Sequence, residues 1–167
     1  MHSPTPAAEP GPTSTAADDR LSDELTSVVA AARRRALRDG DRHIDTAHLL
    51  HSLLETDPAV RALFDDGQVA RLLGYLVQRS IGYGLQWQGT VEDSGAVPVV
   101  RDAAGWSPAA ATAMEAALAR ADRRGGDRVG GVDLLVALAR DPECRAVEVL
   151  GRAGVDPRTL VAQAPPR

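Results

Sequence analysis

The sequence predicts an all-α fold built as a pseudo-twofold tandem repeat of two four-helix motifs, about eight helices in all. Three observations support this prediction. Aromatic residues make up only 3% of the 167 residues, which disfavours a sheet. Apolar residues recur at helical spacing over several segments. The same succession of helix caps, glycine stops and leucine pairs then returns after an offset of 85 residues, from Ser22 to Ser107.

The composition excludes several classes of function. None of the 19 basic residues is lysine, so the sequence contains no Walker A nucleotide site, which needs a lysine to reach the phosphates. Asparagine is absent as well, which is typical of a GC-rich genome such as an actinobacterial one. The net charge of −4 disfavours nucleic-acid binding.

The compartment follows from the cysteine content and the hydropathy pattern. The single cysteine, Cys144, cannot form an internal disulfide, which fits a reducing environment. The amino-terminal residues lack the basic and apolar regions of a signal peptide, and no apolar run of membrane-spanning length occurs elsewhere. We therefore expect a cytoplasmic protein that does not associate with a membrane.

The chain divides into a tail, a double domain and a short end. Residues 1–20 are rich in proline, alanine and threonine, so we predict a disordered tail. The double domain is predicted over 21–163, followed by a tail over 164–167. Within the domain we expect repeat one over 21–81, a linker over 82–105 and repeat two over 106–163.

The helices of repeat one follow from caps and breakers. Ser22 is the expected N-cap of a first helix, which Gly40 ends. A second helix starts at Asp45 or Thr46 and stops before the Asp57-Pro58 pair. Two more helices are predicted, over Ala59 to about Phe64 and over about Val69 to Ile81.

The linker and repeat two differ sharply in character. Residues 82–105 contain five glycines and no helical periodicity, so we predict a connecting loop. Ser107 then caps a helix with Pro108 at its first position, and Gly125-Gly126 ends it. Leu134-Leu135 repeats Leu49-Leu50, and Asp141-Pro142 repeats Asp57-Pro58, so repeat two is expected to copy repeat one.

Four short motifs carry a resemblance to the amino-terminal domain of Clp-family unfoldases: His43-Ile44-Asp45-Thr46-Ala47-His48-Leu49-Leu50, Val129-Gly130-Gly131-Val132-Asp133-Leu134-Leu135, Gly154-Val155-Asp156 and Trp106-Ser107-Pro108. The resemblance implies a bundle of eight helices that receives substrates and adaptors. In the family this domain sits on a hexameric ATPase ring. Because no ATPase sequence follows repeat two, we expect a free-standing domain.

The sequence departs from this family at the positions of two glutamates. In some members, a glutamate of each repeat helps to recognise phosphorylated arginine, but Ala47 and Val132 stand at those positions here. Asp133 also replaces the second histidine of the family pattern. Alanine and valine cannot pair with a guanidinium, so phosphoarginine binding is not carried over.

The resemblance predicts a non-enzymatic binding module of the Clp protein-quality-control system. Its partner would be a Clp-family ATPase, an adaptor, a substrate protein or a peptide-like small molecule. We expect this ligand in a groove between the repeats, formed by Leu21, Leu25, Val28, Val29, Trp87, Trp106 and Met114. An alternative is sequestration of the cyclic-peptide antibiotics that bind this groove in some family members.

A third hypothesis is a small metal-dependent hydrolase that uses His43, His48 and His51. Histidines three residues apart on one helix face can share a metal. We favour the interpretation that His48 is a structural histidine near a helix start and that the other two are partly exposed. The prediction therefore assigns no catalytic residue, no metal ligand and no cofactor.

Overall fold

The computed structural model describes residues 20–80, 105–126 and 128–165, and within these ranges it is all-α and contains eight helices. Repeat one supplies α2 (Asp23–Asp39), α3 (Thr46–Thr56), α4 (Pro58–Arg61) and α5 (Asp66–Ser80). Repeat two supplies α6 (Pro108–Arg123), α7 (Gly131–Ala139), α8 (Arg145–Arg152) and α9 (Pro157–Gln163). The predicted fold class is confirmed. The predicted tail and linker fall almost entirely outside the described residues.

The first helix of each repeat begins and ends as the sequence predicts. The hydroxyls of Ser22 and Ser107 accept hydrogen bonds from the amides of Leu25 and Ala110, at 3.0 and 3.1 Å. After both helices a glycine takes a left-handed conformation, with φ of 73° at Gly40 and 74° at Gly125. A side chain at either position would be strained, which explains why glycine recurs at the same offset.

Two predicted boundaries were wrong by a few residues. The short helix α4 spans Pro58–Arg61 instead of Ala59 to about Phe64, and Asp57 caps its start by accepting from the amides of Ala59 and Val60. The helix α5 begins at Asp66 instead of Val69. Its start is fixed by Asp65 and Gln68, each of which accepts the other's amide in its side chain, at 2.7 and 3.0 Å. The predicted end at Ile81 lies outside the described residues.

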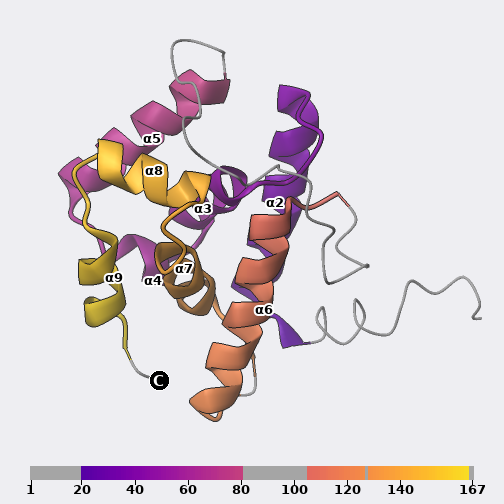
Figure 1. Cartoon of the computed structure of the whole chain (residues 1–167), viewed down its shortest axis with the longest axis vertical. Helices are drawn as coiled ribbons and strands as arrows, with labels where there is room; N and C mark the ends of the chain where they lie inside the picture. Colours follow the sequence, from indigo (N-terminus) through magenta and orange to yellow (C-terminus); the bar gives the residue numbers. More distant parts are fainter. Residues whose placement is uncertain (1–19, 81–104, 127, 166–167) are drawn as a thin grey trace, which may run out of the picture.

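The leucine-pair helices α3 and α7 form the centre of the molecule, and the other helices surround them (Figure 1). The first nine residues of α3 are buried, as are all residues of α7 except Val132. A helix that is apolar on every side must lie inside a bundle. The leucines that the sequence pairs, Leu49-Leu50 and Leu134-Leu135, all have exposures of 0%.

Short backbone segments of the two repeats pair with each other. The residues before α2 pair in parallel with those before α7, through the Leu21–Val129 bridge. The equivalent residues, before α6 and before α3, pair through the Ile44–Trp106 bridge. Each residue of one bridge lies 85 positions from its counterpart in the other, so the two bridges are related by the pseudo-twofold symmetry. This reciprocal pairing holds the repeats together as one unit.

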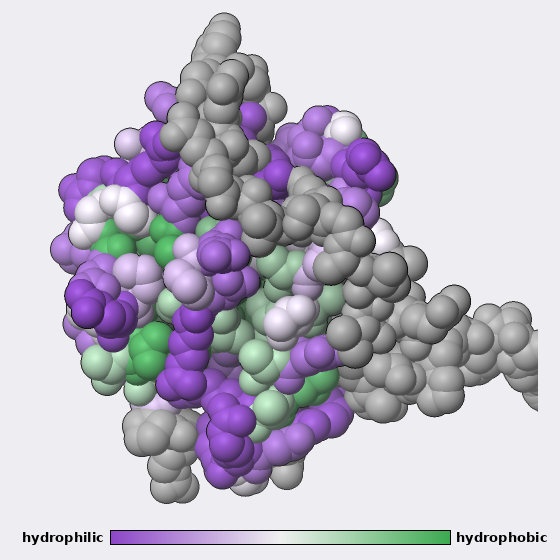
Figure 2. All heavy atoms as spheres, in the orientation of Figure 1, coloured by the Kyte–Doolittle hydropathy of each residue, from purple (hydrophilic) through white to green (hydrophobic). Residues whose placement is uncertain are grey.

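One face of the molecule combines polar and apolar surface. In the view of Figure 2, purple residues surround a pale green band that runs over the alanine-rich helix α6. Among the helices of the described residues, none combines the length and the apolar character needed to cross a membrane. Within the described part of the chain, the large apolar side chains exposed to solvent are Leu37 and Val77.

Candidate binding site

The starts of α3 and α7 occupy equivalent places in the two repeats but carry different residues. Asp45, Thr46 and His48 in repeat one correspond to Gly130, Gly131 and Asp133 in repeat two. Every helix start exposes amide groups that lack partners within the helix, so something else must satisfy them. The two repeats meet this requirement in different ways.

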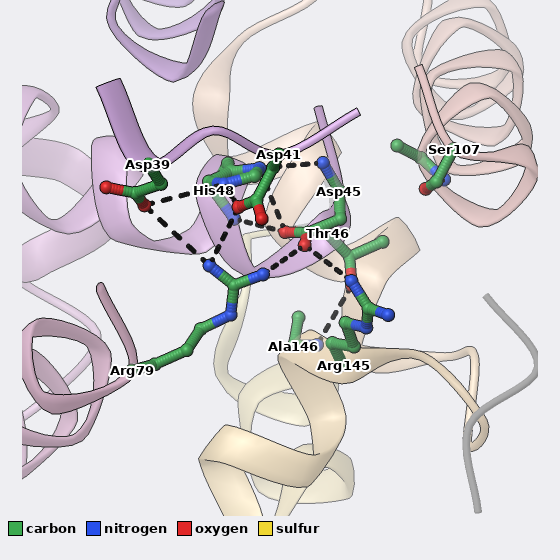
Figure 3. Close-up of polar contacts among 10 residues, drawn as sticks. Asp39, Asp41, Asp45, Thr46, His48, Arg79, Ser107, Arg145 and Ala146 are labelled. Atoms are coloured by element: carbon green, nitrogen blue, oxygen red, sulfur yellow. Dashed lines mark hydrogen bonds and ion pairs between the residues drawn. The ribbon is translucent and has the colours of Figure 1, made fainter. Parts of the chain in front are cut away.

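Asp45 uses one carboxylate oxygen to cap α3 and the other to bind two arginines. Oδ1 accepts from the His48 amide at 2.8 Å, and the His48 ring accepts the Asp45 amide at 2.9 Å, which completes a capping box. Oδ2 accepts from Arg79 of α5 and from Arg145 of α8, both at 2.8 Å (Figure 3). Asp45 is 1% exposed, so these two arginines balance a buried charge.

Further contacts fill the remaining space around the start of α3. Nε2 of His48 lies 2.8 Å from a carboxylate oxygen of Asp41, and Arg79 donates to the same oxygen at 3.2 Å. The hydroxyl of Thr46 accepts the backbone amide of Ala146 at 2.9 Å (Figure 3). The first repeat therefore closes this helix start with its own side chains and with the first residues of α8.

The histidines of the hydrolase hypothesis are not brought together as a metal site. In the part of the chain that the structure describes, the group of potential ligands is Asp39, Asp41 and His48, without His43 or His51. Arg79 lies on both of these aspartates, so a guanidinium already supplies the positive charge that a metal would bring.

His51 lies in a separate contact with Arg35 and Glu55. Its Nε2 is 3.3 Å from a carboxylate oxygen of Glu55, and Arg35 donates a hydrogen bond to the same carboxylate. Burial, followed by the charge of Arg35, lowers the pKa of His51 from 6.5 to about 4. His51 is therefore a neutral core residue at neutral pH, not the partly exposed side chain that the sequence suggested.

At the start of α7, the carboxylate of Asp133 binds both the backbone and two arginines. It accepts the Gly130 amide at 2.9 Å and hydrogen bonds from Arg120 and Arg124. Burial raises the pKa of this carboxyl, but the hydrogen bonds from Arg124, Gly130 and Arg120 outweigh it, so the pKa lies below 3.8. Gly130 and Gly131 add no side chain in front of the helix.

A surface hollow of about 610 Å³ lies at this second helix start. Both repeats contribute to its wall, which is lined by Ser22, Glu24, Asp57, Pro58, Ala59, Arg120, Arg124, Gly130, Gly131, Val132, Asp133 and Pro165. The hollow is thus the counterpart of the ion-pair cluster at the start of α3, left open because two glycines replace Asp45 and Thr46.

Asp57 brings a buried carboxylate to the wall of this hollow. It is 4% exposed, and its Oδ1 accepts from the amides of Ala59 and Val60. Its Oδ2 lies against Gly131, where a Cβ atom would overlap it. Among the described residues, no donor forms a hydrogen bond with Oδ2. Gly131 is therefore required for Asp57 to take this position.

No family model and no curated protein sequence matches the chain. Solved structures do match it. The N-terminal domain of the caseinolytic protease-associated chaperone ClpD from Arabidopsis thaliana superposes with a TM-score of 0.64 at 18% identity, over 87% of this chain and 92% of that one. The Hsp104 N-terminal domain from Candida albicans gives a TM-score of 0.63 at 13% identity, over 86% and 88%.

A third match, from structural investigations of a malarial protein secretion system, has a TM-score of 0.62 at 17% identity and covers 86% of this chain and 90% of that one. The chain has a Clp N-domain-like fold. The resemblance inferred from the short motifs is confirmed at this level. At these identities, the likeness concerns the architecture and leaves ligands to be argued from the residues present.

The groove residues expected from the Clp N-domain-like pattern are mostly core residues. Five of the seven are at most 9% exposed, namely Leu21, Leu25, Val28, Trp106 and Met114. Val29 is partly buried. Trp87 lies outside the described residues. The hollow at α7 is lined by other residues, so the expected groove and this hollow are different places.

The sequence interpretation missed Asp57 as a site residue. It treated the Asp57-Pro58 pair as a helix breaker, whereas the structure uses it to end α3 and to cap α4. The available signal was the glycine pair Gly130-Gly131, at the place where repeat one has Asp45-Thr46. Two glycines at a helix start suggest open space or a close approach, which here is made by Asp57.

Proposed function

We propose that the chain is a non-enzymatic binding module of the Clp protein-quality-control system. It holds a segment of a Clp-family ATPase, an adaptor or a substrate protein between its two repeats. The observation that carries this proposal is the hollow at the start of α7, whose wall is made by both repeats. A site shared by two halves of a rigid domain is a common place for ligands.

The fold supports the same proposal. The matched domains are named as the N-terminal domains of the caseinolytic protease-associated chaperone ClpD and of Hsp104, and the likeness covers most of this chain. The side chains of the described residues also supply structural roles more readily than catalytic ones. The His48 ring is held by Asp45 and Asp41, and Cys144 is buried with its thiol 3.5 Å from the Leu138 carbonyl.

Binding can be measured directly with two purified probes. Fluorescein-labelled casein represents an unfolded substrate protein, and a Clp-family ATPase ring from the same organism represents the machine itself. Fluorescence anisotropy with casein and sedimentation velocity with the ATPase should each show saturable micromolar binding. A folded protein such as serum albumin serves as the control ligand and should not bind.

A matched pair of variants tests whether the hollow is the binding surface. Val132→Arg fills the hollow from its half-buried wall, whereas Val77→Arg makes the same change on exposed α5. We expect Val132→Arg to weaken binding about tenfold or more, as for a central contact residue, and Val77→Arg to leave it nearly unchanged. Failure of the wild-type chain to bind either probe would contradict the proposed function.

A further inference from the structure

The second half of α2 carries three arginines around one leucine. This basic strip consists of Arg33, Arg34, Leu37 and Arg38, all of which are exposed. Leu37 is 75% exposed, against 49% for Val77, the other large apolar side chain that the described residues leave in solvent. The last turns of α2 lie at the edge of the molecule (Figure 1), so the basic strip is open to a partner.

No acid of the described residues neutralises the basic strip. None of its three guanidiniums forms an ion pair or a hydrogen bond within this part of the chain. The acids around this end of α2 are engaged elsewhere: Asp39 and Asp41 both lie against Arg79 of α5. Glu55 binds Arg35, the remaining arginine of α2. The strip is therefore a local excess of positive charge on a chain whose net charge is −4.

The stability of α2 does not account for the basic strip. Residues three and four positions apart are neighbours on a helix, so Arg34 lies beside Leu37 and Arg38. Like charges at this spacing destabilise a helix, which makes the pair of Arg34 and Arg38 unfavourable. The negative end of the helix dipole favours a cation in the last turn, where Arg38 lies, but not one as early as Arg33 or Arg34. The strip is therefore better explained by a partner than by the helix itself.

The fold does not require a basic strip either. At the equivalent positions of α6, 85 residues later, Leu118 and Ala119 replace the first two arginines, and Asp122 replaces the exposed leucine. Asp122 is itself paired, 2.7 Å from Arg20. Arg123 keeps the position of the third arginine. Since repeat two fills the same place in the bundle without the strip, the strip is a feature of repeat one.

We propose that the basic strip is a second interaction surface, which binds a short acidic segment of a partner protein. Carboxylates of the segment bind the guanidiniums, whose planar donors match a carboxylate, and an apolar side chain packs on Leu37. Arginine is enriched in protein interfaces, and covering an exposed leucine removes apolar surface from water. This surface is additional to the hollow of the proposed function. Glu24 lines the hollow from the first turn of α2, about 20 Å along the helix from Leu37.

Nucleic acid and anionic membranes are the competing partners, because they too are negatively charged. Both are extended polyanions, and the net charge of −4 on the whole chain repels them at long range. A short acidic segment contacts the strip alone, where the charge is positive. Leu37 finds no apolar counterpart on a phosphate backbone, and one leucine buries too little area to anchor a protein to a membrane.

An NMR titration of the isotopically labelled full chain tests this proposal. A peptide that repeats the triplet Glu-Glu-Leu should shift the backbone amides of residues 33–38 saturably, and added salt should weaken its binding. A peptide that repeats Gln-Gln-Leu lacks the charge and should leave these amides in place. A single-stranded oligothymidine and phosphatidylserine vesicles represent the competing partners, and both should bind less tightly than the acidic peptide.

Two variants at equivalent positions of the repeats form a matched pair. Arg38→Glu reverses a charge of the basic strip and should weaken peptide binding about tenfold or more. Arg123→Glu makes the same change at the end of α6, outside the strip, and should leave binding nearly unchanged. Both positions are exposed and lie in the last turn of their helices, so their effects on stability should be similar. Leu37→Ser keeps the charges and should weaken binding severalfold.

Three results would overturn the proposal: equal binding by Arg38→Glu and Arg123→Glu, equal binding of the glutamine peptide, or tighter binding of oligothymidine or vesicles than of the acidic peptide. If Arg38→Glu proves unfolded, Arg34→Glu, also at an exposed position, decides the question. If the acidic peptide fails while casein or the ATPase still binds, the proposed function stands and the basic strip is not a binding surface. If the acidic peptide binds while both proteins fail, only the proposed function falls.

Discussion

The starts of α3 and α7 show how one helical motif can be closed in one repeat and open in the other. At α3, Asp45 draws Arg79 from α5 and Arg145 from α8, and the space is filled with ion pairs. At α7, Gly130 and Gly131 stand in front of the helix and a hollow remains. The two symmetric backbone bridges show that the backbones around the two helix starts are arranged equivalently. The difference therefore lies in a few side chains, not in the fold.

The largest expected effect is at the closed end. Asp45→Ala removes the cap of α3 and leaves two arginines without their buried partner, so the free energy of unfolding should fall by about 3–5 kcal/mol. Asp133→Ala at the open end should cost less, because its arginines are more exposed, at 16% and 19% against 9% and 14%. Urea unfolding measures the free energy of unfolding of both variants. A larger decrease for Asp133→Ala than for Asp45→Ala would contradict this difference between the two helix starts.

Acid should act on the two repeats in different pH ranges. Because the pKa of His51 is about 4 in the folded chain and 6.5 ordinarily, the unfolded chain binds the proton more readily. Stability is thus complete above pH 6.5 and declines as the pH falls to 4, by about 3 kcal/mol. Val136 stands at the equivalent place in repeat two, so His51→Val should flatten this decline in unfolding experiments across pH.

Asp133 extends the acid response to lower pH. Its folded pKa lies below 3.8, so its contribution is present above that pH and is lost as the pH falls through the folded value. Asp133→Asn should therefore lower the free energy of unfolding near neutral pH. It should also remove part of the fall in stability that the wild-type chain shows below about pH 3.8. Unfolding curves of this variant that keep the wild-type slope below pH 3.8 would contradict the assignment.

Gly131→Ala tests the close approach that shapes the open end. A Cβ atom there would overlap the Asp57 carboxylate, so a loss of about 1–3 kcal/mol is expected from overpacking. Gly74→Ala is the matched control, since a Cβ on Gly74 of α5 meets nothing within 4 Å. Alanine is the better helix former, so this variant should gain up to about 1 kcal/mol. Equal stability changes for both variants, by thermal or urea unfolding, would argue against the approach.

The parts of the fold that the sequence could predict are those fixed by local chemistry. Ser22 and Ser107 cap helices through bonds three residues away, and Gly40 and Gly125 end them through their own backbone conformation. Because these signals recur after 85 residues, they also predicted the tandem arrangement of two similar helical repeats. Boundaries failed where a reciprocal side-chain cap, as at Asp65 and Gln68, started a helix early.

The candidate site was less predictable because its residues meet only through packing. Arg145 reaches Asp45 across 100 positions of sequence, and Asp57 meets Gly131 across the boundary between the repeats. Neither contact has a periodic or spacing signal. The expected groove drew on apolar residues of helical spacing, and such residues usually fill a core, as Leu25 and Val28 do here.

The most direct test of the account is hydrogen–deuterium exchange of the full chain, with and without saturating casein or the purified Clp-family ATPase. New protection is expected at residues 56–62 and 128–134, which form the open end, and no change is expected at residues 43–50, which are already closed. Protection at 43–50 without protection at 128–134, or none anywhere upon binding, would contradict the account.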